Sequence, residues 1–161
     1  MKKLLCLLLL CILFIPCAWA QGESTQGEDN FTLWFEDGFS LSIPEGWVSY
    51  PSGDAGEPDI RYVLGDADGS RYMYIQRRAT ALEDIDALDA ALTAHESYEK
   101  TGELRFNGQT FLAFIAADLN ASGCMTILDG HLLTFIFTPQ TDSDYMLLAA
   151  EIMDSFSSLA G

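Results

Sequence analysis

The chain has 161 residues, of which 24 are acidic and only 8 are basic, so its formal net charge at pH 7 is −16. A polypeptide this acidic is repelled by nucleic acids and by anionic membrane surfaces, which excludes both as electrostatic partners. The length suits one domain, and a domain of this size can bury a core large enough to fold without disulfides.

The first twenty residues have the three parts of a secretory signal peptide. Two lysines precede an apolar run over residues 4–15, and Ala18 and Ala20 supply the small side chains that a signal peptidase recognises. The apolar run is shorter than the roughly 20 residues that a bilayer-spanning helix needs. We therefore expect residues 1–20 to be a signal peptide that is cleaved after Ala20, so that the mature protein is secreted with no membrane span.

An alternative is a lipoprotein in which Cys17 carries the lipid. Phe14, Ile15 and Pro16 disfavour this alternative, because the residue before a lipidated cysteine is normally small. Removal of the signal takes away three of the four cysteines, which leaves Cys124 with no partner for an intrachain disulfide. Removal of the two lysines changes the net charge from −16 to −18.

The mature chain is expected to begin with a short leader and to form one domain. Residues 21–30 contain no apolar side chain and are expected to be a flexible leader. Residues 31–35 and 39–43 then alternate between apolar and polar, which predicts two half-buried strands. The single domain is expected to cover residues 31–161.

The turn between the first two strands is specified by their register. A three-residue turn pairs Phe35 with Phe39 and gathers the apolar side chains on one face, whereas a two-residue turn does not. Gly38 then stands at the left-handed position of that turn. A second tight turn at residues 44–46 ends the hairpin, and Trp47 is expected to cover the end of the core. This stretch is therefore architectural.

The middle of the chain predicts a second hairpin and a helix. Residues 51–59 have the composition of a loop, and residues 60–64 and 71–78 indicate strands. Over residues 81–100 the apolar positions change to spacings of three and four, which is typical of an amphipathic helix.

The last third of the chain predicts two more hairpins and a closing helix. Asn-Gly at 107–108 and Asp-Gly at 129–130 are strong hairpin turns. The strands beside them are apolar on both faces, as in the middle of a covered sheet. Apolar residues then recur at helical spacing to Leu159, and Thr141 with Asp144 resembles a capping box.

The expected order is β-β-β-β-α-β-β-β-β-α. The expected fold class is α+β, an α/β/α sandwich with about eight mostly antiparallel strands and helices on both faces.

The stretches DGFSLSIPEGW, FNGQTFLAF, DGHLLTFIF and AAEIMDSFSSL, with the acidic helix between them, resemble a known group of bacterial proteins. They are similar to secreted domains with the fold of the photosystem II extrinsic P protein (PsbP-like), which the Mog-type Ran-binding protein shares. The resemblance covers residues 31–159. It implies an α/β/α sandwich and a family whose better-understood members bind other macromolecules and are not enzymes, while most secreted bacterial relatives have no assigned function.

We expect no catalytic residue, no metal site and no cofactor. Cys124 and His131 would lie on one face but four strand positions apart, about 13 Å, which is too far for a nucleophile and its base. Asp66, Asp68 and Gly69 faintly match a calcium loop, but the first and twelfth ligand positions are apolar, so they are expected to form a hairpin connection. Weak Ca²⁺ binding by so acidic a chain is left open. His95, His131 and Cys124 lack the spacing of zinc ligands.

A binding surface is expected on the hairpin of residues 61–78. Tyrosine and arginine dominate binding hot spots, and this hairpin holds most of the basic residues of the mature chain. The residues of this expected surface are Arg61, Tyr62, Arg71, Tyr72, Tyr74, Arg77 and Arg78. The sequence therefore predicts a secreted non-catalytic module that binds a protein or a cell-surface component, of unknown identity and oligomeric state. The alternative is a small extracellular hydrolase with a carboxylate site.

Overall fold

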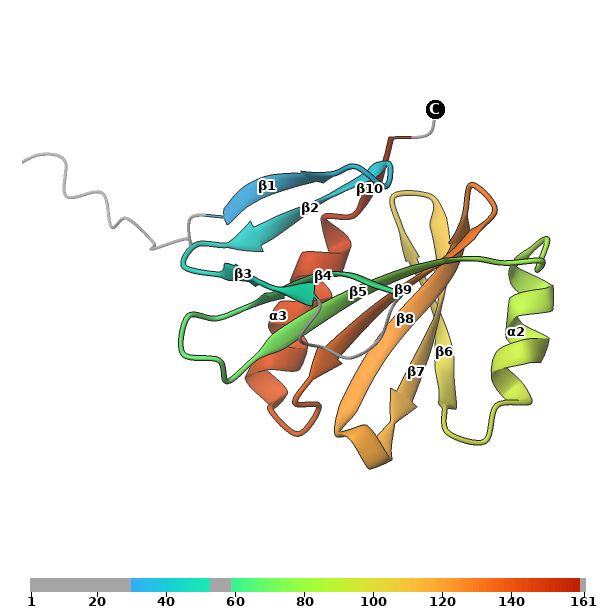
Figure 1. Ribbon diagram of the computed structural model, residues 1–161. Helices are drawn as coiled ribbons and strands as arrows, with labels where there is room; N and C mark the ends of the chain where they lie inside the picture. Colours follow the sequence, from blue (N-terminus) through green and yellow to red (C-terminus); the bar gives the residue numbers. More distant parts are fainter. Residues whose placement is uncertain (1–29, 53–58, 160–161) are drawn as a thin grey trace, which may run out of the picture.

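The computed structural model describes residues 30–52 and 59–159, which contain ten strands and two α-helices (Figure 1). The signal peptide, most of the leader and most of the 51–59 loop lie outside the described residues. In chain order the elements are β1 (Asn30–Phe35), β2 (Phe39–Pro44), β3 (Val48–Tyr50), β4 (Ile60–Gly65), β5 (Tyr72–Ala79), α2 (Ile85–Thr93), β6 (Glu99–Phe106), β7 (Gln109–Ala116), η2 (Ala117–Leu119), β8 (Ala121–Leu128), β9 (His131–Thr138), α3 (Ser143–Asp154) and β10 (Ser157–Ser158).

The predicted α/β/α sandwich is wrong, because the described strands form two antiparallel sheets and the fold is mostly β. The large sheet has seven strands in the order β3-β4-β5-β9-β8-β7-β6, and the small sheet has three in the order β1-β2-β10. The first hairpin therefore does not extend the large sheet but forms a separate layer above it (Figure 1). Strand patterns specify which residues alternate, and they leave open which strands pair.

Each face of the large sheet has its own core. On the inner face, defined by residues such as Phe111 and Phe135, the small sheet and α3 cover the strands. On the outer face, defined by residues such as Leu112 and Phe114, the helix α2 packs mainly over β6, β7 and β8 and also reaches Leu132 of β9. The nine-residue α2 is too short to cover the whole outer face, so the β4, β5 and β9 side has no helix above it (Figure 1).

The first hairpin has the predicted register. Phe35 lies opposite Phe39, the Gly38 amide donates to the Phe35 carbonyl at 3.1 Å, and Gly38 has a left-handed φ of +87°. Phe39 then packs edge-on against Phe135 of the large sheet, with ring centres 5.6 Å apart. Trp47 packs against the same core, so its predicted place at the end of the core is confirmed.

The two later hairpins also turn where predicted. Asn107 and Asp129 have φ values of 45° and 49°, and each is followed by a left-handed glycine. Because the 129–130 turn has two residues, Leu128 lies opposite His131 and Cys124 lies opposite Phe135, as expected.

Both helices are shorter than predicted. The Asp84 carboxylate caps α2 by accepting the Ala87 amide, and the helix ends at Thr93 instead of residue 100. Beyond it, Tyr98 packs against Phe114 and the chain becomes the edge strand β6. The cap of α3 is Asp142, not Thr141.

The last helix ends at Asp154 because Phe156 turns into the core and the next two residues pair with β2. This two-residue strand, β10, and the three-residue strand β3 were not predicted from the sequence. Strands this short carry too few alternations to be recognised.

Candidate functional site

The seven residues of the expected binding surface do not share one face. Side chains of a strand alternate between its two sides, so β5 directs Met73, Ile75 and Arg77 to the inner face. Tyr74 and Arg78 point to the outer face, together with Gln76 between them. The structure therefore divides the predicted surface into an inner set, which the fold uses, and an outer set.

Tyr62 and Arg77 belong to the inner set. The Tyr62 ring packs edge-on against Phe35, with centres 4.9 Å apart, and burial followed by the nearby Asp37 charge raises the pKa of its hydroxyl. The Arg77 guanidinium donates to Asp37 Oδ1 at 2.8 Å and lies 3.3 Å from His131 Nδ1. Asp37 is buried, and its other oxygen has no hydrogen-bond partner among the described residues, so Arg77 is its main compensation.

Arg71 joins the start of β5 to α3. Its Nε and Nη2 atoms both lie 2.9 Å from Asp142 Oδ2, and its guanidinium stands 5.7 Å from the centre of the Tyr145 ring. The hydrogen bond with Asp142 raises the pKa of Arg71. Because Asp142 also caps α3, this pair holds a helix end against the sheet.

The outer set lines a groove of about 580 Å³ on the part of the outer face that α2 leaves uncovered. Tyr74 and Gln76 form its floor, opposite Ile136 and Thr134 of the neighbouring strand β9. Its other lining residues are Asp59, Ile60, Arg78, Tyr98, Leu119, Ala121 and Thr138. A volume in this range is typical of ligand sites. We call it the outer-face groove.

The groove continues under α2. A smaller hollow of about 170 Å³ shares Gln76, Arg78 and Tyr98 with it and reaches His95 and Thr134. The His95 and Tyr98 rings are stacked with centres 4.5 Å apart, so the segment after α2 presents a flat aromatic wall. Under α2 the hollow is also lined by apolar side chains, which are Leu82, Leu88, Ala91, Leu92, Met125 and Leu132. Polar, aromatic and aliphatic groups therefore surround a continuous depression.

Five side chains of this depression have polar groups that are unpaired within the described fold, although some of their rings take part in packing. They are Tyr74, Gln76, Arg78, Tyr98 and Thr134, and none makes a side-chain hydrogen bond or ion pair with another described residue. By contrast, both inner-face arginines of the hairpin are paired. Burial raises the pKa of the Tyr74 hydroxyl, so this group stays protonated at neutral pH and can donate a hydrogen bond.

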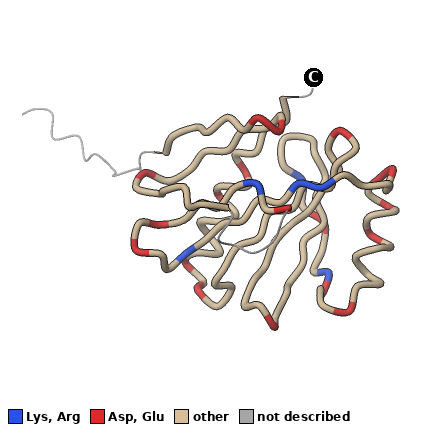
Figure 2. Tube along the Cα trace, in the orientation of Figure 1, with Lys and Arg blue, Asp and Glu red and all other residues tan. Residues whose placement is uncertain are grey.

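Arg78 is an unpaired basic side chain in the groove of a strongly acidic protein. Figure 2 shows acidic residues spread over the loops and α2, whereas basic residues are few. Arg78 is exposed in the groove, and its only carboxylate neighbour among the lining residues is Asp59. A free guanidinium on so acidic a protein is a specific attachment point for a carboxylate.

The remaining predicted residues lie outside the groove. Tyr72 stands at the end of the tyrosine row, with its ring 6.0 Å from that of Tyr74 and 5.3 Å from that of Tyr50. Arg61 is exposed on β4. Gln76, Tyr98 and Thr134 were not among the residues predicted from the sequence. The period of two along β5 could have separated Gln76 from Arg77, but Tyr98 and Thr134 come from other segments that only the fold brings close.

The structure also shows the surroundings of the residues that were considered as a nucleophile or as metal ligands. Cys124 is buried, and its burial raises the pKa of the thiol. Asp66 accepts the Ser70 hydroxyl at 2.7 Å and the Arg71 amide at 3.1 Å, which makes this segment a hairpin connection. No group of three or more potential metal ligands occurs within residues 30–52 and 59–159.

Two described carboxyl groups have clearly shifted pKa values, and both are lowered. Burial alone would raise the pKa of Asp66, but hydrogen bonds from Ser70 and Arg71 lower it. The Tyr145 amide, and then Arg71, lower the pKa of Asp142. A general acid at neutral pH needs a raised pKa, so a lowered pKa does not suit that role. Both carboxylates instead accept hydrogen bonds from nearby backbone amides. The carboxylate hydrolase stays an alternative prediction.

Comparison with known proteins supports the fold. The structure is similar to the solution structure of cyanobacterial PsbP (CyanoP) from Synechocystis sp. PCC 6803, with a TM-score of 0.57 and 13% sequence identity over 84% of this chain and 95% of that one. It also matches a crystal structure from Bacteroides thetaiotaomicron VPI-5482, with a TM-score of 0.47 and 14% identity over 74% of this chain. The match spans 44% of that protein.

No protein-family model and no curated protein sequence matches the chain. The comparisons thus show a PsbP-like fold, while the predicted likeness to the Mog-type Ran-binding protein stays a prediction.

Proposed function

We propose that the protein is a secreted, non-catalytic binding module that binds its partner, a protein or a cell-surface component, through the outer-face groove. The observation that carries this proposal is the set of five polar side chains that line one depression and whose polar groups make no hydrogen bond or ion pair with the described residues. Folded proteins normally use their half-buried polar groups internally, so a cluster of unused ones favours an external partner.

The types of side chain in the groove indicate what the partner presents. The Arg78 guanidinium can hold a carboxylate through two parallel hydrogen bonds. Tyr74 and Tyr98 offer flat rings with hydroxyl groups, and Gln76 can both donate and accept. Tyrosine and arginine are among the residue types that provide most of the binding energy in protein interfaces. The matching partner surface has an acidic group beside an apolar or planar one.

Export is part of the proposal and rests on the N-terminal sequence pattern. No helix among the described residues is long and apolar enough to cross a membrane. Intact-mass measurement of protein from the medium should give a chain that begins at Gln21. A diacylglyceryl group on Cys17 would contradict this.

Capture of partners tests the proposed surface. The mature chain is immobilised, partners from the producing culture are bound, and bound proteins are identified by mass spectrometry. Arg78→Ala and Tyr74→Ala should each lose the partner. Arg105→Ala is the matched control, because Arg105 is also exposed but does not line the groove. Equal capture by Arg78→Ala and wild type, with both proteins folded, would refute the groove as the binding surface.

A further inference from the structure

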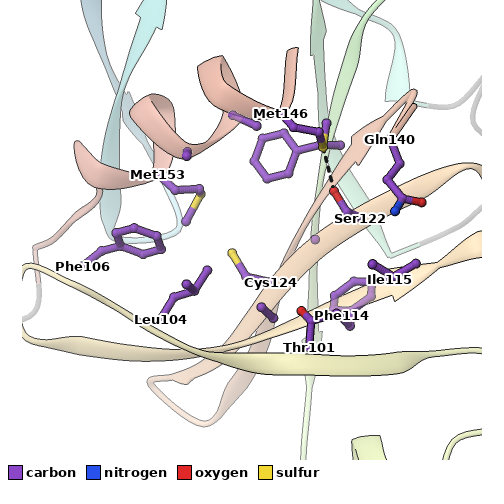
Figure 3. Close-up of a pocket in the computed structure, with 15 residues that line it drawn as sticks. Thr101, Leu104, Phe106, Phe114, Ile115, Ser122, Cys124, Gln140, Met146 and Met153 are labelled. Atoms are coloured by element: carbon purple, nitrogen blue, oxygen red, sulfur yellow. Dashed lines mark hydrogen bonds between the residues drawn. The ribbon is translucent and has the colours of Figure 1, made fainter. Parts of the chain in front are cut away.

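A second depression lies on the inner face, on the opposite side of the sheet from the outer-face groove. Helix α3 covers the centre of this face, but between α3 and strands β6, β7 and β8 a groove of about 500 Å³ remains. Figure 3 shows side chains of α3 and of the three strands pointing into this common space. We call it the α3 groove.

None of the fifteen residues that line the α3 groove is charged. Met146 and Met153 come from the helix, and Leu104 and Phe106 come from the edge strand β6. The other lining residues are Thr101, Ala113, Phe114, Ile115, Ser122, Gly123, Cys124, Phe137, Gln140, Ala149 and Ala150. Methionine side chains are flexible and adapt to apolar ligands. Burying a charged group against an uncharged lining of this extent would cost free energy, which disfavours charged ligands.

The groove has one polar end. The Ser122 hydroxyl is 3.0 Å from the Met146 sulfur and is therefore already engaged. The Gln140 backbone is fixed by a 2.8 Å hydrogen bond from its amide to the Asn120 carbonyl, but its side chain makes no hydrogen bond with any described residue. Figure 3 shows Gln140 at one end of the groove and Phe106 at the other. The remaining polar side chain of the lining is Thr101, which lies between Leu104 and Ile115 in Figure 3. A mostly apolar space with an unpaired amide at one end fits an extended chain better than a compact ring.

We propose that the α3 groove binds a single aliphatic chain that ends in an uncharged polar group. The chain lies along Leu104, Phe106 and Met153, and its polar end pairs with the Gln140 amide. Both cations of β6 are directed away from this space, since Lys100 bonds to Asp89 of α2 and Arg105 does not line the groove. An anionic head group would therefore lose its hydration at the groove without gaining a partner. This site is independent of the proposed function at the outer-face groove.

The first test is calorimetric titration of the mature protein with 1-alkanols from hexanol to decanol. Each added methylene should raise the affinity about fourfold while the groove still has room for it. Decanoate at pH 8 should bind at least tenfold more weakly than decanol. No binding, or an affinity that does not depend on chain length, would overturn the proposal.

Substitutions then locate the binding. Ala150 is exposed on α3 and lines the groove, so Ala150→Phe fills the space without entering the core. It should weaken decanol binding by more than tenfold. Leu147→Phe is the matched control, because Leu147 is exposed on the same helix and does not line the groove, and it should bind as wild type does. Gln140→Ala should weaken decanol binding about fivefold through the lost hydrogen bond.

Two further experiments on the same protein test two other possible occupants of the α3 groove, a lipid membrane and a second copy of the chain. If it floats with neutral phosphatidylcholine vesicles but does not bind decanol, the groove is a membrane contact and the proposal is wrong. If wild type self-associates in sedimentation experiments, and Ala150→Phe abolishes this while decanol does not bind, the occupant is a second copy of the chain. Equal decanol affinity in Ala150→Phe and Leu147→Phe would also contradict the proposal.

Discussion

Arg77 and Arg78 are neighbours on strand β5, yet they have opposite surroundings. Arg77 reaches the inner face, where it compensates the buried Asp37 carboxylate at 2.8 Å. Arg78 lies in the outer-face groove and makes no ion pair with a described residue. The two residues have the same chemistry, so the difference comes from the alternation of the strand alone. Residue type indicated a binding hairpin, and only the direction of each side chain shows which half of it is free to bind.

Substitutions on the two sides of β5 should differ most in their effect on the free energy of unfolding where the inner side chain lies in the core. Ile75 is fully buried on the inner face, so Ile75→Ala should lower the free energy of unfolding by about 2–5 kcal/mol through lost packing and a residual cavity. Gln76→Ala, its neighbour on the outer face, is the control and should change this energy by less than about 0.5 kcal/mol. Urea denaturation measures both. Equal losses would mean that the two faces do not differ as described.

The next effect should come from Arg77. Arg77→Ala leaves the Asp37 carboxylate buried without a counter-charge. Fully buried pairs lose about 3–5 kcal/mol when one partner is removed, and about 2–3 kcal/mol is expected here because Arg77 keeps some contact with solvent. Chemical denaturation of Arg77→Ala and of Asp37→Asn with Arg77→Ala should show that the double variant recovers part of the loss. A loss below about 0.5 kcal/mol would show that the pair does not support the fold.

A smaller effect should depend on pH at the Arg71–Asp142 contact. The Tyr145 amide and Arg71 lower the pKa of Asp142 in the folded protein. Its contribution to stability is therefore complete above the unfolded pKa, about 3.9, and is lost as the pH falls through the lower folded value. Asp142→Asn should flatten the acid limb of a plot of stability against pH, whereas Asp144→Asn, on the same helix turn, should change the slope less. An unchanged slope in Asp142→Asn would contradict this assignment.

The smallest effect on stability is expected at Arg78. Because this guanidinium has no partner in the described fold, Arg78→Ala should leave the free energy of unfolding within about 0.5 kcal/mol of wild type. Thermal denaturation beside Arg77→Ala makes the comparison direct. A loss as large as that of Arg77→Ala would show that Arg78 supports the fold and is not reserved for a partner.

Local structure was largely predictable from the sequence. The pairing of Phe35 with Phe39 followed from alternation together with Gly38, and the turns at 107–108 and 129–130 followed from residues that accept left-handed backbone. These features depend on contacts between residues close in the sequence. The large sheet's order depends on contacts between distant residues, so the separate small sheet, and with it the fold class, was not predicted correctly.

The candidate site was predictable in part for the same reason. Tyr74 and Arg78 stand out by type within one strand, whereas Tyr98 reaches the groove from the segment after α2 and Thr134 from β9. No pattern in the sequence links these segments. Arg71 and Arg77 were assigned to a binding surface because their partners, Asp142 and Asp37, lie far away along the chain.

Photo-crosslinking tests most directly the claim that the outer face is the binding face. A photoreactive phenylalanine derivative replaces Leu119, which lines the outer-face groove and is 67% exposed, or Trp34, which lies on the small sheet and is 68% exposed. The two positions are matched in exposure, so a nonspecific partner would react with both. We expect the partner captured from the culture to crosslink at position 119 and not at position 34. Crosslinking at position 34 and not at position 119 would contradict the assignment of the binding surface.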